Sequence, residues 1–577
     1  MKDDKQSEIE KLKAEVERLK KELKKRKKYG LVWEDKPEEV VEMCKEKLPV
    51  LKEVKEKEII TDKDKPVNLL IEGDNYHALS VLNYTHAGKI DVIYIDPPYN
   101  TGNKDFIFND HYVDREDAYR HSKWLSFMEK RLKLAKNLLK DTGVIFISID
   151  DNEVAQLKLL CDQIFGEDNL VEIFYIQVRY ASKSLNEKDP FQKLIEEVLI
   201  YAKNKNKFLP NKPKIEYELE KFRFQIVEKS KGEEIILGNK KVVIFKPGEY
   251  EVIEKEEGNV NLLKATWASG SVLKGNTSGK FFHNYIEKRK KIDGLNVLYK
   301  VYGIGEDGLG YRYFTGPKKE NTTKGLFYSG IPLDKKEAIL NNKTIYKEKP
   351  IVNFYDYSAD FGNITHEGGV GFRSGKKPVK LLKNLINLHK DKNALVLDFF
   401  AGSGSTGHAV LSLNAEDGGN RQFILCTNNE ENICTDFCYP RIKNVIKGWG
   451  KYKGLVGNLK YFRTDFVDAE PSDKNKIKLT KQATEMLCIK EGTFEKVIDN
   501  ERFKIFKNSN HYTGIIWDQT AIPEFKEAIK DIEGKFSVYV FSLGDETFDD
   551  EFKDVKQNIK LSPIPEAILR VYRRIFK

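Results

Sequence analysis

The sequence "DVIYIDPPYN" (residues 91–100) joins a buried strand to an abrupt polar end. Its first half, "DVIYI", is an apolar run rich in β-branched residues, which is typical of a strand buried on both faces. The two prolines that follow cannot continue a strand, because each lacks an N–H group and has a fixed φ. The stretch therefore predicts a strand that stops at Asp96 and presents a carboxylate, two rigid carbonyls and an aromatic ring.

Strands and helices alternate on both sides of this stretch. Strands are predicted at 67–74 and 143–150, and helices at 75–84, 119–140 and 153–165. Such alternation predicts a doubly wound, Rossmann-like α/β fold around a parallel sheet. Ligands of these sheets bind beyond the carboxyl ends of the strands, where Asp74, Asp96 and Asp150 are expected to lie.

The alternation fails over 176–360, where short β-like runs are mixed with Gly, Asn, Lys and aromatic residues. This stretch is interpreted as an inserted domain. The alternation resumes with a predicted helix at 377–390, a strand–loop–helix at 394–413 and a strand at 421–430. A separate α/β segment follows after about residue 470.

Length and composition indicate a globular chain of several domains. The chain has 577 residues, of which 40% are hydrophobic and 33% charged, and its net charge of +9 modestly favours a polyanionic partner. The six scattered cysteines do not form a zinc-binding pattern, so we predict no metal. No signal peptide or long apolar run is recognised, which predicts a cytoplasmic location. Residues 5–28 carry apolar positions at spacings of 3 and 4, which favours a coiled coil over a single solvated helix.

The second motif, "LDFFAGSGSTG" (397–407), turns a strand into a helix through a Gly-rich loop. Glycines allow a ligand to approach the backbone closely, and the helix start offers free N–H groups. No Lys-Ser/Thr pair follows the last glycine, so this is not a Walker A loop. It does not match the dinucleotide-binding fingerprint either, because no acid follows at the required distance.

The two motifs together fit the transfer of a methyl group to an exocyclic amine of a base. That nitrogen is a poor nucleophile, because its lone pair is delocalised into the ring. Asp96 and the Pro97 carbonyl can accept its hydrogens, and Tyr99 can stack on the base. The base must leave the duplex first. The Gly-rich loop would hold an activated methyl donor beside it.

"DPPY" with "FFAGSGSTG" resembles the S-adenosylmethionine-dependent amino-methyltransferases of DNA, and the order of the motifs resembles their β class. Flanking blocks such as "YGLVWEDKPEEVVE" and "IPEAILRVYRRIF" resemble the modification subunit of type III restriction–modification systems. The predicted domains are a coiled-coil helix (1–30), the catalytic half of a methyltransferase domain (31–175), an inserted target-recognition domain (176–360), the donor-binding half (361–470) and a C-terminal partner or DNA-interaction domain (471–577).

The resemblance implies roles for residues of this sequence. Its catalytic motif is Asp96, Pro97, Pro98 and Tyr99. S-adenosyl-L-methionine is expected at Asp74, Lys377, Pro378, Asp398, Phe400, Ala401, Gly402, Ser403, Gly404, Thr406, Asn429 and Glu430. In the family an aspartate in the first catalytic position favours adenine N6 as the acceptor. Double-stranded DNA, a second copy of the chain and a helicase–nuclease subunit are the implied partners.

Several alternatives remain open. The chain could act as a stand-alone methyltransferase, methylate cytosine N4, or be a catalytically silent DNA-binding specificity subunit. Asp150, Asp151 and Glu153 could form a carboxylate cluster, although acids before a helix usually cap it. The basic run 288–291, with Phe281, Phe282 and Tyr285 nearby, could contact DNA or be a solvated face.

Overall fold

The computed structural model describes Glu15 and residues 31–183, 190–216, 218–268, 277–305, 307–341, 346–372, 375–509, 511–544 and 546–576. These residues form two compact units. The larger unit contains the described residues up to Asn211 and from Val352 onward, and the smaller contains Lys212–Ile351. The coiled coil predicted over 5–28 lies outside the described residues, apart from Glu15.

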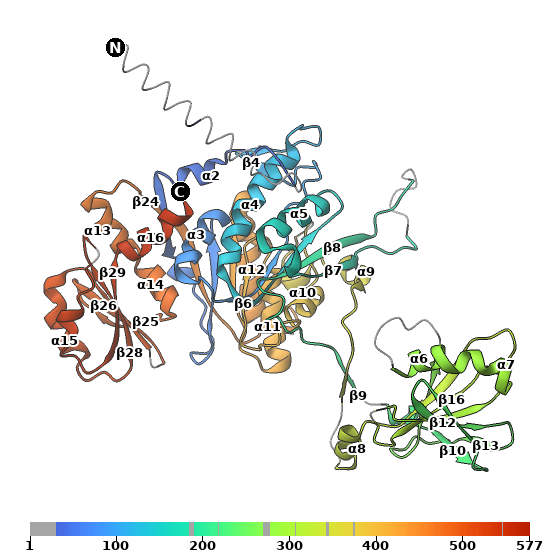
Figure 1. The fold of residues 1–577 in the computed structure, drawn as a ribbon. Helices are drawn as coiled ribbons and strands as arrows, with labels where there is room; N and C mark the ends of the chain where they lie inside the picture. The colour runs from blue at the N-terminus through green and yellow to red at the C-terminus, as the bar shows by residue number, and fades with distance from the viewer. Residues whose placement is uncertain are drawn as a thin grey trace. The chain divides into compact units, whose positions relative to one another are not determined.

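A ten-stranded mixed sheet forms the centre of the larger unit (Figure 1). Its middle strands are parallel, in the order β24 (Asn458–Asp468), β2 (Val67–Glu72), β21 (Gln422–Thr427), β20 (Leu395–Asp398), β3 (Ile90–Ile95) and β6 (Leu139–Ile149). β1 (Lys47–Glu53) is antiparallel at one edge. β8 (Ile195–Ala202), β7 (Leu170–Gln177) and β19 (Phe354–Asp356) extend the other edge, and β8 is antiparallel to β6. The predicted α/β fold is confirmed, with antiparallel strands added at both edges.

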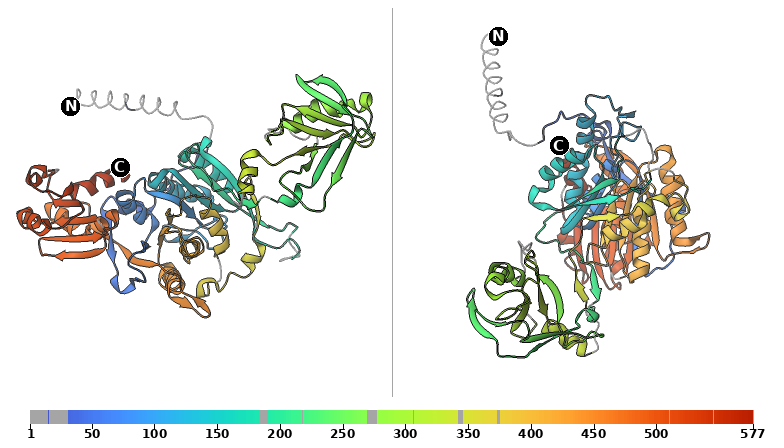
Figure 2. Two further views of the ribbon diagram at one scale, coloured as in Figure 1. Left: turned by 90° about the horizontal axis from the view of Figure 1, so that it is seen from below. Right: turned by 90° about the vertical axis from the view of Figure 1, so that its right-hand side faces the viewer.

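Helices cover both faces of this sheet (Figure 2). One face carries α3 (Asn75–Thr85), α4 (Arg120–Leu138) and α5 (Val154–Phe165), and the other carries α10 (Val379–Ile386), α11 (Ser405–Asp417) and α12 (Tyr439–Lys447). All six residues of β3 are buried, as expected for a parallel strand covered on both faces. Among the helices that the structure describes, none is both long and apolar enough to cross a membrane.

β3 and β20 are neighbours in the sheet although they are far apart in the chain. Val92 pairs with Val396 and Ile93 with Leu397 in a parallel ladder. The carboxyl ends of the two strands therefore meet at one edge, and the catalytic motif follows one strand where the Gly-rich loop follows the other.

The smaller unit has a six-stranded antiparallel sheet and its own core. Its strands are β11 (Glu233–Leu237), β12 (Lys240–Phe245), β15 (Leu298–Tyr302), β16 (Tyr311–Thr315), β17 (Gly325–Ser329) and β14 (Lys264–Ala268). The unit is shorter at both ends than the predicted insertion 176–360, because β8 and β19 pair within the large sheet. β8 was not predicted as a strand of the large sheet, because the sequence around its buried apolar run is irregular.

The basic run of the smaller unit is largely engaged within the unit. Phe281 and Phe282 belong to the core beneath it, so they are not exposed for stacking. Arg289 pairs with Asp293, and Lys290 donates to the backbone carbonyls of residues 320 and 322. These contacts give Arg289 and Lys290 a structural role, whereas Lys288, Lys291 and Tyr285 remain exposed on this segment.

The segment predicted as a C-terminal domain is part of the larger unit. It contains a five-stranded sheet of β25 (Glu495–Asp499), β26 (Phe503–Asn508), β27 (His511–Ile516), β28 (Lys535–Phe541) and β29 (Asn558–Ile564). Its helices include α14 (Thr484–Glu491) and α16 (Glu566–Ile575). Met486 and Tyr572 of these helices lie in the same hydrophobic cluster as α3, and the Tyr572 hydroxyl donates to the Pro49 carbonyl. This segment and the sheet therefore share one core.

Candidate functional site

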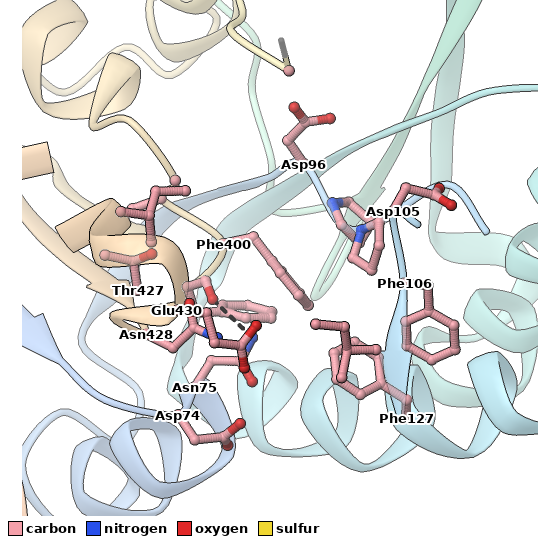
Figure 3. Close-up of a pocket in the computed structure, with 18 of the residues that line it drawn as sticks. Asp74, Asn75, Asp96, Asp105, Phe106, Phe127, Phe400, Thr427, Asn428 and Glu430 are labelled. Atoms are coloured by element: carbon pink, nitrogen blue, oxygen red, sulfur yellow. Dashed lines mark hydrogen bonds between the residues drawn. The ribbon is translucent and has the colours of Figure 1, made fainter. Parts of the chain in front are cut away.

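A cavity of about 1120 Å³ opens at the carboxyl ends of the middle strands. Figure 3 shows the Phe400 side chain between Asp96 on one side and Asp74, Asn75, Asn428 and Glu430 on the other. Of the predicted site residues, those that line the cavity are Asp74, Asp96, Pro97, Pro98, Tyr99, Lys377, Asp398, Phe400, Ala401, Gly402, Ser403, Thr406 and Glu430.

Three predicted residues do not line the cavity. Pro378 is buried directly before α10. A Cβ added to Gly404 would lie 3.1 Å from the Cys438 sulfur, so this glycine permits close packing behind the loop. The Asn429 amide oxygen accepts from the backbone N–H groups of Cys434 and Thr435, 3.1 and 3.0 Å away. Asn429 therefore stabilises the next turn, and Asn428 faces the cavity in its place.

The catalytic motif is held by a network of side chains. Asp96 Oδ1 lies 3.0 Å from the Tyr99 hydroxyl and 3.2 Å from Lys377 Nζ. The Tyr99 hydroxyl also lies 3.0 Å from Glu196 Oε2, and Lys377 Nζ lies 2.9 Å from the same oxygen. Burial raises the pKa of Asp96, and the Lys377 ammonium opposes this shift. Burial alone would lower the pKa of Lys377, but Asp96 and Glu196 raise it above its ordinary value.

Two adjacent lysines occupy different environments. Lys376 Nζ donates to the carbonyls of Thr365 and Val370, each 2.7 Å away, and burial lowers its pKa to about 8. Lys377 instead points to the catalytic motif, and its Nζ lies 2.7 Å from the Tyr99 hydroxyl. Lys377 was predicted to bind the methyl donor, but its ammonium lies among the catalytic side chains.

The Gly-rich loop is stabilised by hydrogen bonds from behind. Asp398 Oδ1 accepts from the Phe400 N–H at 3.0 Å, and its Oδ2 accepts from the Thr406 hydroxyl. Burial raises the pKa of Asp398 to about 7. Buried Arg441 donates to Ser405 Oγ at 2.7 Å and to Ser403 Oγ at 3.2 Å. The loop therefore keeps its shape through hydrogen bonds among its own residues and from Arg441.

The far side of the cavity combines carboxylates with aromatic rings. Asp74 caps α3 by accepting from the Tyr76 N–H at 2.7 Å. Asn75 donates to the Phe399 carbonyl at 3.0 Å and accepts from buried Arg131. The rings of Phe400 and Phe127 lie 5.8 Å apart. This part of the cavity offers oxygen acceptors for hydroxyl or amino groups and an apolar surface for a planar ring.

A buried acid–amide pair lies directly behind the catalytic motif. Asn100 Nδ2 and His121 Nδ1 each lie 2.6 Å from Glu153 Oε1. Asn100 Oδ1 and Glu153 Oε2 are buried without a hydrogen-bond partner. Burial raises the pKa of Glu153 to about 8, which favours the protonated carboxyl, a hydrogen-bond donor, at neutral pH. Glu153 thus holds the Asn100 side chain in place through a hydrogen bond. In the described part of the chain, no group of acids, cysteines or histidines is arranged to hold a metal ion.

Sequence reasoning missed Glu196, Arg131 and Asn75. The sequence "IEEVLIYA" (195–202) contained a signal for the first, because two carboxylates stand at the start of a buried strand without an obvious partner. Arg131 had no such signal, since its position on an amphipathic helix is usual for a basic residue.

Comparisons with known proteins agree with this arrangement. The model of a DNA methylase family, which covers N6 and N4 methyltransferases, matches residues 90–436. The type III restriction–modification enzyme StyLTI Mod subunit of Salmonella typhimurium is 34% identical over 381 residues, which are 62% of this chain and 52% of that protein. The EcoPI Mod subunit of Escherichia phage P1 is 33% identical over 414 residues, covering 63% of this chain and 58% of that protein. The chain thus spans little more than half the length of these relatives.

Among solved structures, a putative DNA modification methylase from Thermus thermophilus, complexed with S-adenosyl-L-methionine, is similar to the chain at 12% identity. The match covers 68% of this chain and 99% of that one, with a TM-score of 0.31.

Proposed function

Because this chain belongs to the DNA methylase family, we propose that it transfers a methyl group from S-adenosyl-L-methionine to the N6 amine of adenine in double-stranded DNA. One observation carries the proposal. The adjacency of β3 and β20 brings the Asp-Pro-Pro-Tyr motif and the Gly-rich loop to one cavity. A methyl acceptor and a methyl donor can therefore be held side by side.

The catalytic motif would bind the acceptor. Oδ1 of Asp96 is occupied by Tyr99 and Lys377, and no hydrogen bond from the described part of the chain reaches its Oδ2. The Trp124 indole N–H donates to the Pro98 carbonyl at 2.7 Å, which leaves the Pro97 carbonyl as the second acceptor. Asp96 Oδ2 and the Pro97 carbonyl would orient the amine through its two hydrogens, so that its lone pair faces the donor.

The residues around the Gly-rich loop fit the donor. S-adenosyl-L-methionine supplies a methyl group activated by a sulfonium centre. Phe400 would pack on its adenine ring, and Asp74 and Glu430 would accept from its hydroxyl or amino groups. Burial raises the pKa of Glu430, which is consistent with a carboxyl that is partly shielded from solvent. Asp398 and Thr406 also line this cavity, and their hydrogen bonds would keep the loop in the shape that binds the donor.

We propose further that the chain is the modification and specificity subunit of a type III system in the cytoplasm. The similarity to two Mod subunits supports this assignment. The unit Lys212–Ile351 would recognise the target sequence, because it is a separate compact body within the methyltransferase sequence. A second copy of the chain and a helicase–nuclease subunit would be its partners, with residues 1–30 and 471–577 contributing to these contacts.

The test is incubation of the protein with duplex DNA and methyl-labelled S-adenosyl-L-methionine, followed by digestion to nucleosides and mass spectrometry. We expect labelled N6-methyladenine from the wild type and none from Asp96→Ala. Labelled N4-methylcytosine would contradict the choice of base. No transfer to any duplex, in spite of measurable donor binding, would favour a silent specificity subunit.

A further inference from the structure

We propose that Glu196 is a positioning residue for methyl transfer and acts by sharing the Lys377 ammonium with Asp96. This inference rests on the proposed function and extends it to a residue of β8 outside both sequence motifs. Glu196 lines the same cavity as Asp96, and Lys377 Nζ lies between their carboxylates, 2.9 Å from Glu196 and 3.2 Å from Asp96.

The Tyr99 hydroxyl connects the same two carboxylates. It lies 3.0 Å from an oxygen of each, and it accepts from Lys377 at 2.7 Å. One hydroxyl has one hydrogen to donate, so Tyr99 serves one carboxylate at a time. With both acids present, neither Lys377 nor Tyr99 binds Asp96 alone. Glu196 thus limits how strongly the two donors engage the Asp96 carboxylate.

The charge of the network suits the reaction. During transfer the C–S bond of the sulfonium breaks, an N–C bond forms, and positive charge moves from sulfur to the amine nitrogen until a proton leaves that nitrogen to solvent. Two carboxylates and one ammonium leave an excess of one negative charge near Asp96. Such a charge stabilises the positive charge that develops on the amine. Without Glu196, Lys377 would neutralise Asp96 and remove this excess.

Glu197, the next residue of β8, provides a matched control. Neighbouring residues of a strand point to opposite faces, and Glu197 does not line the cavity. Burial raises the pKa of Glu197 to about 7, with smaller contributions from the carboxylates of Asp151, Asp150 and Glu196. Glu196→Gln and Glu197→Gln therefore change neighbouring carboxyls of the same strand on opposite faces, and Glu197→Gln removes a full negative charge only above about pH 7.

The first experiment compares steady-state kinetics and pH profiles of these variants in the full-length protein. We expect Glu196→Gln to lower kcat about 30-fold, less than the roughly 100- to 1000-fold found for removal of a direct electrostatic contact, because Glu196 acts through Lys377, while the KM for S-adenosyl-L-methionine stays within about twofold. The Glu196 charge raises the pKa of Asp96, so its loss should move the acidic limb of kcat to lower pH. Lys377→Met should move that limb to higher pH, because Lys377 lowers the same pKa. Glu197→Gln should match the wild type.

The second experiment needs no methyl transfer. Competitive acetylation with acetic anhydride over a pH series, followed by peptide mass spectrometry, measures the apparent pKa of Lys377. We expect this pKa to fall in Glu196→Gln and to stay unchanged in Glu197→Gln, since Glu196 raises it. An unchanged Lys377 pKa, or wild-type kcat and pH profile in Glu196→Gln, would overturn the proposal. If Glu196→Gln changes the acetylation of Lys377 but the wild-type protein transfers no methyl group to DNA, the proposed function is wrong. The contact of Glu196 with Lys377 is then still supported.

Discussion

Two aspartates stand at the ends of neighbouring strands and have opposite surroundings. Asp398, the last residue of β20, is 3% exposed, and both of its oxygens accept from the loop that follows. Asp96, after β3, has a side chain that is 18% exposed and contacts Lys377 from a distant segment and, through Tyr99, Glu196. Asp398 therefore stabilises the loop at this edge of the sheet, whereas Asp96 presents a hydrogen-bond acceptor to the cavity at the same edge. Substitutions should separate these two tasks.

The largest effect is expected from Asp96→Ala. This variant removes the acceptor that would orient the amine, so kcat should fall about 1000-fold, the upper range for such a contact. The dissociation constant for S-adenosyl-L-methionine, measured by calorimetry, should change less than about threefold, because the loop after β20 does not depend on Asp96. A parallel loss of donor affinity would contradict the division of tasks.

Asp398→Ala should instead weaken donor binding. The Phe400 N–H and the Thr406 hydroxyl would lose their acceptor, which costs about 2 kcal/mol and corresponds to a donor dissociation constant about 30-fold higher. Asp398→Asn keeps an oxygen for the Phe400 N–H and serves as the conservative control, with a smaller increase expected. Unchanged donor affinity in Asp398→Ala would mean that the loop holds its shape without this carboxylate.

Gly402→Val tests the same loop from its cavity side. Gly402 has a φ of 49°, which a β-branched residue adopts with strain, and a Val side chain there would face the donor. We expect the donor dissociation constant to rise about tenfold. Gly418→Val is the matched control, since its φ of 70° implies similar strain at the end of α11, away from the cavity. It should lower Tm and leave donor affinity unchanged.

The smallest effect concerns the acid–amide pair behind Asp96. The pKa of Glu153 is about 8 in the folded protein against an ordinary value of 4.5, so the folded state holds the proton more tightly. The free energy of unfolding should therefore decrease as pH rises from about 4.5 to 8. Glu153→Gln is neutral at every pH, and its amide can donate where the proton did. At pH 9 its Tm should exceed that of the wild type by about 3 °C.

At pH 4 the Tm values of the two proteins should be similar, because the Glu153 carboxyl is then largely protonated in both the folded and the unfolded state. An equal difference at both pH values would show that the buried carboxyl does not titrate as described.

The central strands of the large sheet could be predicted from the sequence, because each of them has a clear local pattern. The apolar run before Asp96 and the strand before the Gly-rich loop each predict their own element, and the α/β alternation predicts their common edge. The position of Lys377 depends on the hydrogen bonds of its neighbour Lys376 to the carbonyls of Thr365 and Val370, which no local pattern encodes. Glu196 reaches the cavity because β8 pairs with β6, although α5 and β7 lie between these two strands in the chain. Such non-local contacts explain why the roles of Glu196 and Lys377 were not predicted. They also explain why the inserted domain was predicted to be longer than the smaller unit is.

The strand order also has a consequence for biosynthesis. β2 is paired on one side with β21 and on the other with β24, both of which follow the smaller unit in the chain. During translation, the strands from β3 to β8 can pair with one another, while β2 has no partner until β21 has been synthesised and gains its second partner only with β24. The nascent chain thus exposes an unpaired apolar strand for most of its synthesis, and its yield should depend on chaperones and on the speed of elongation.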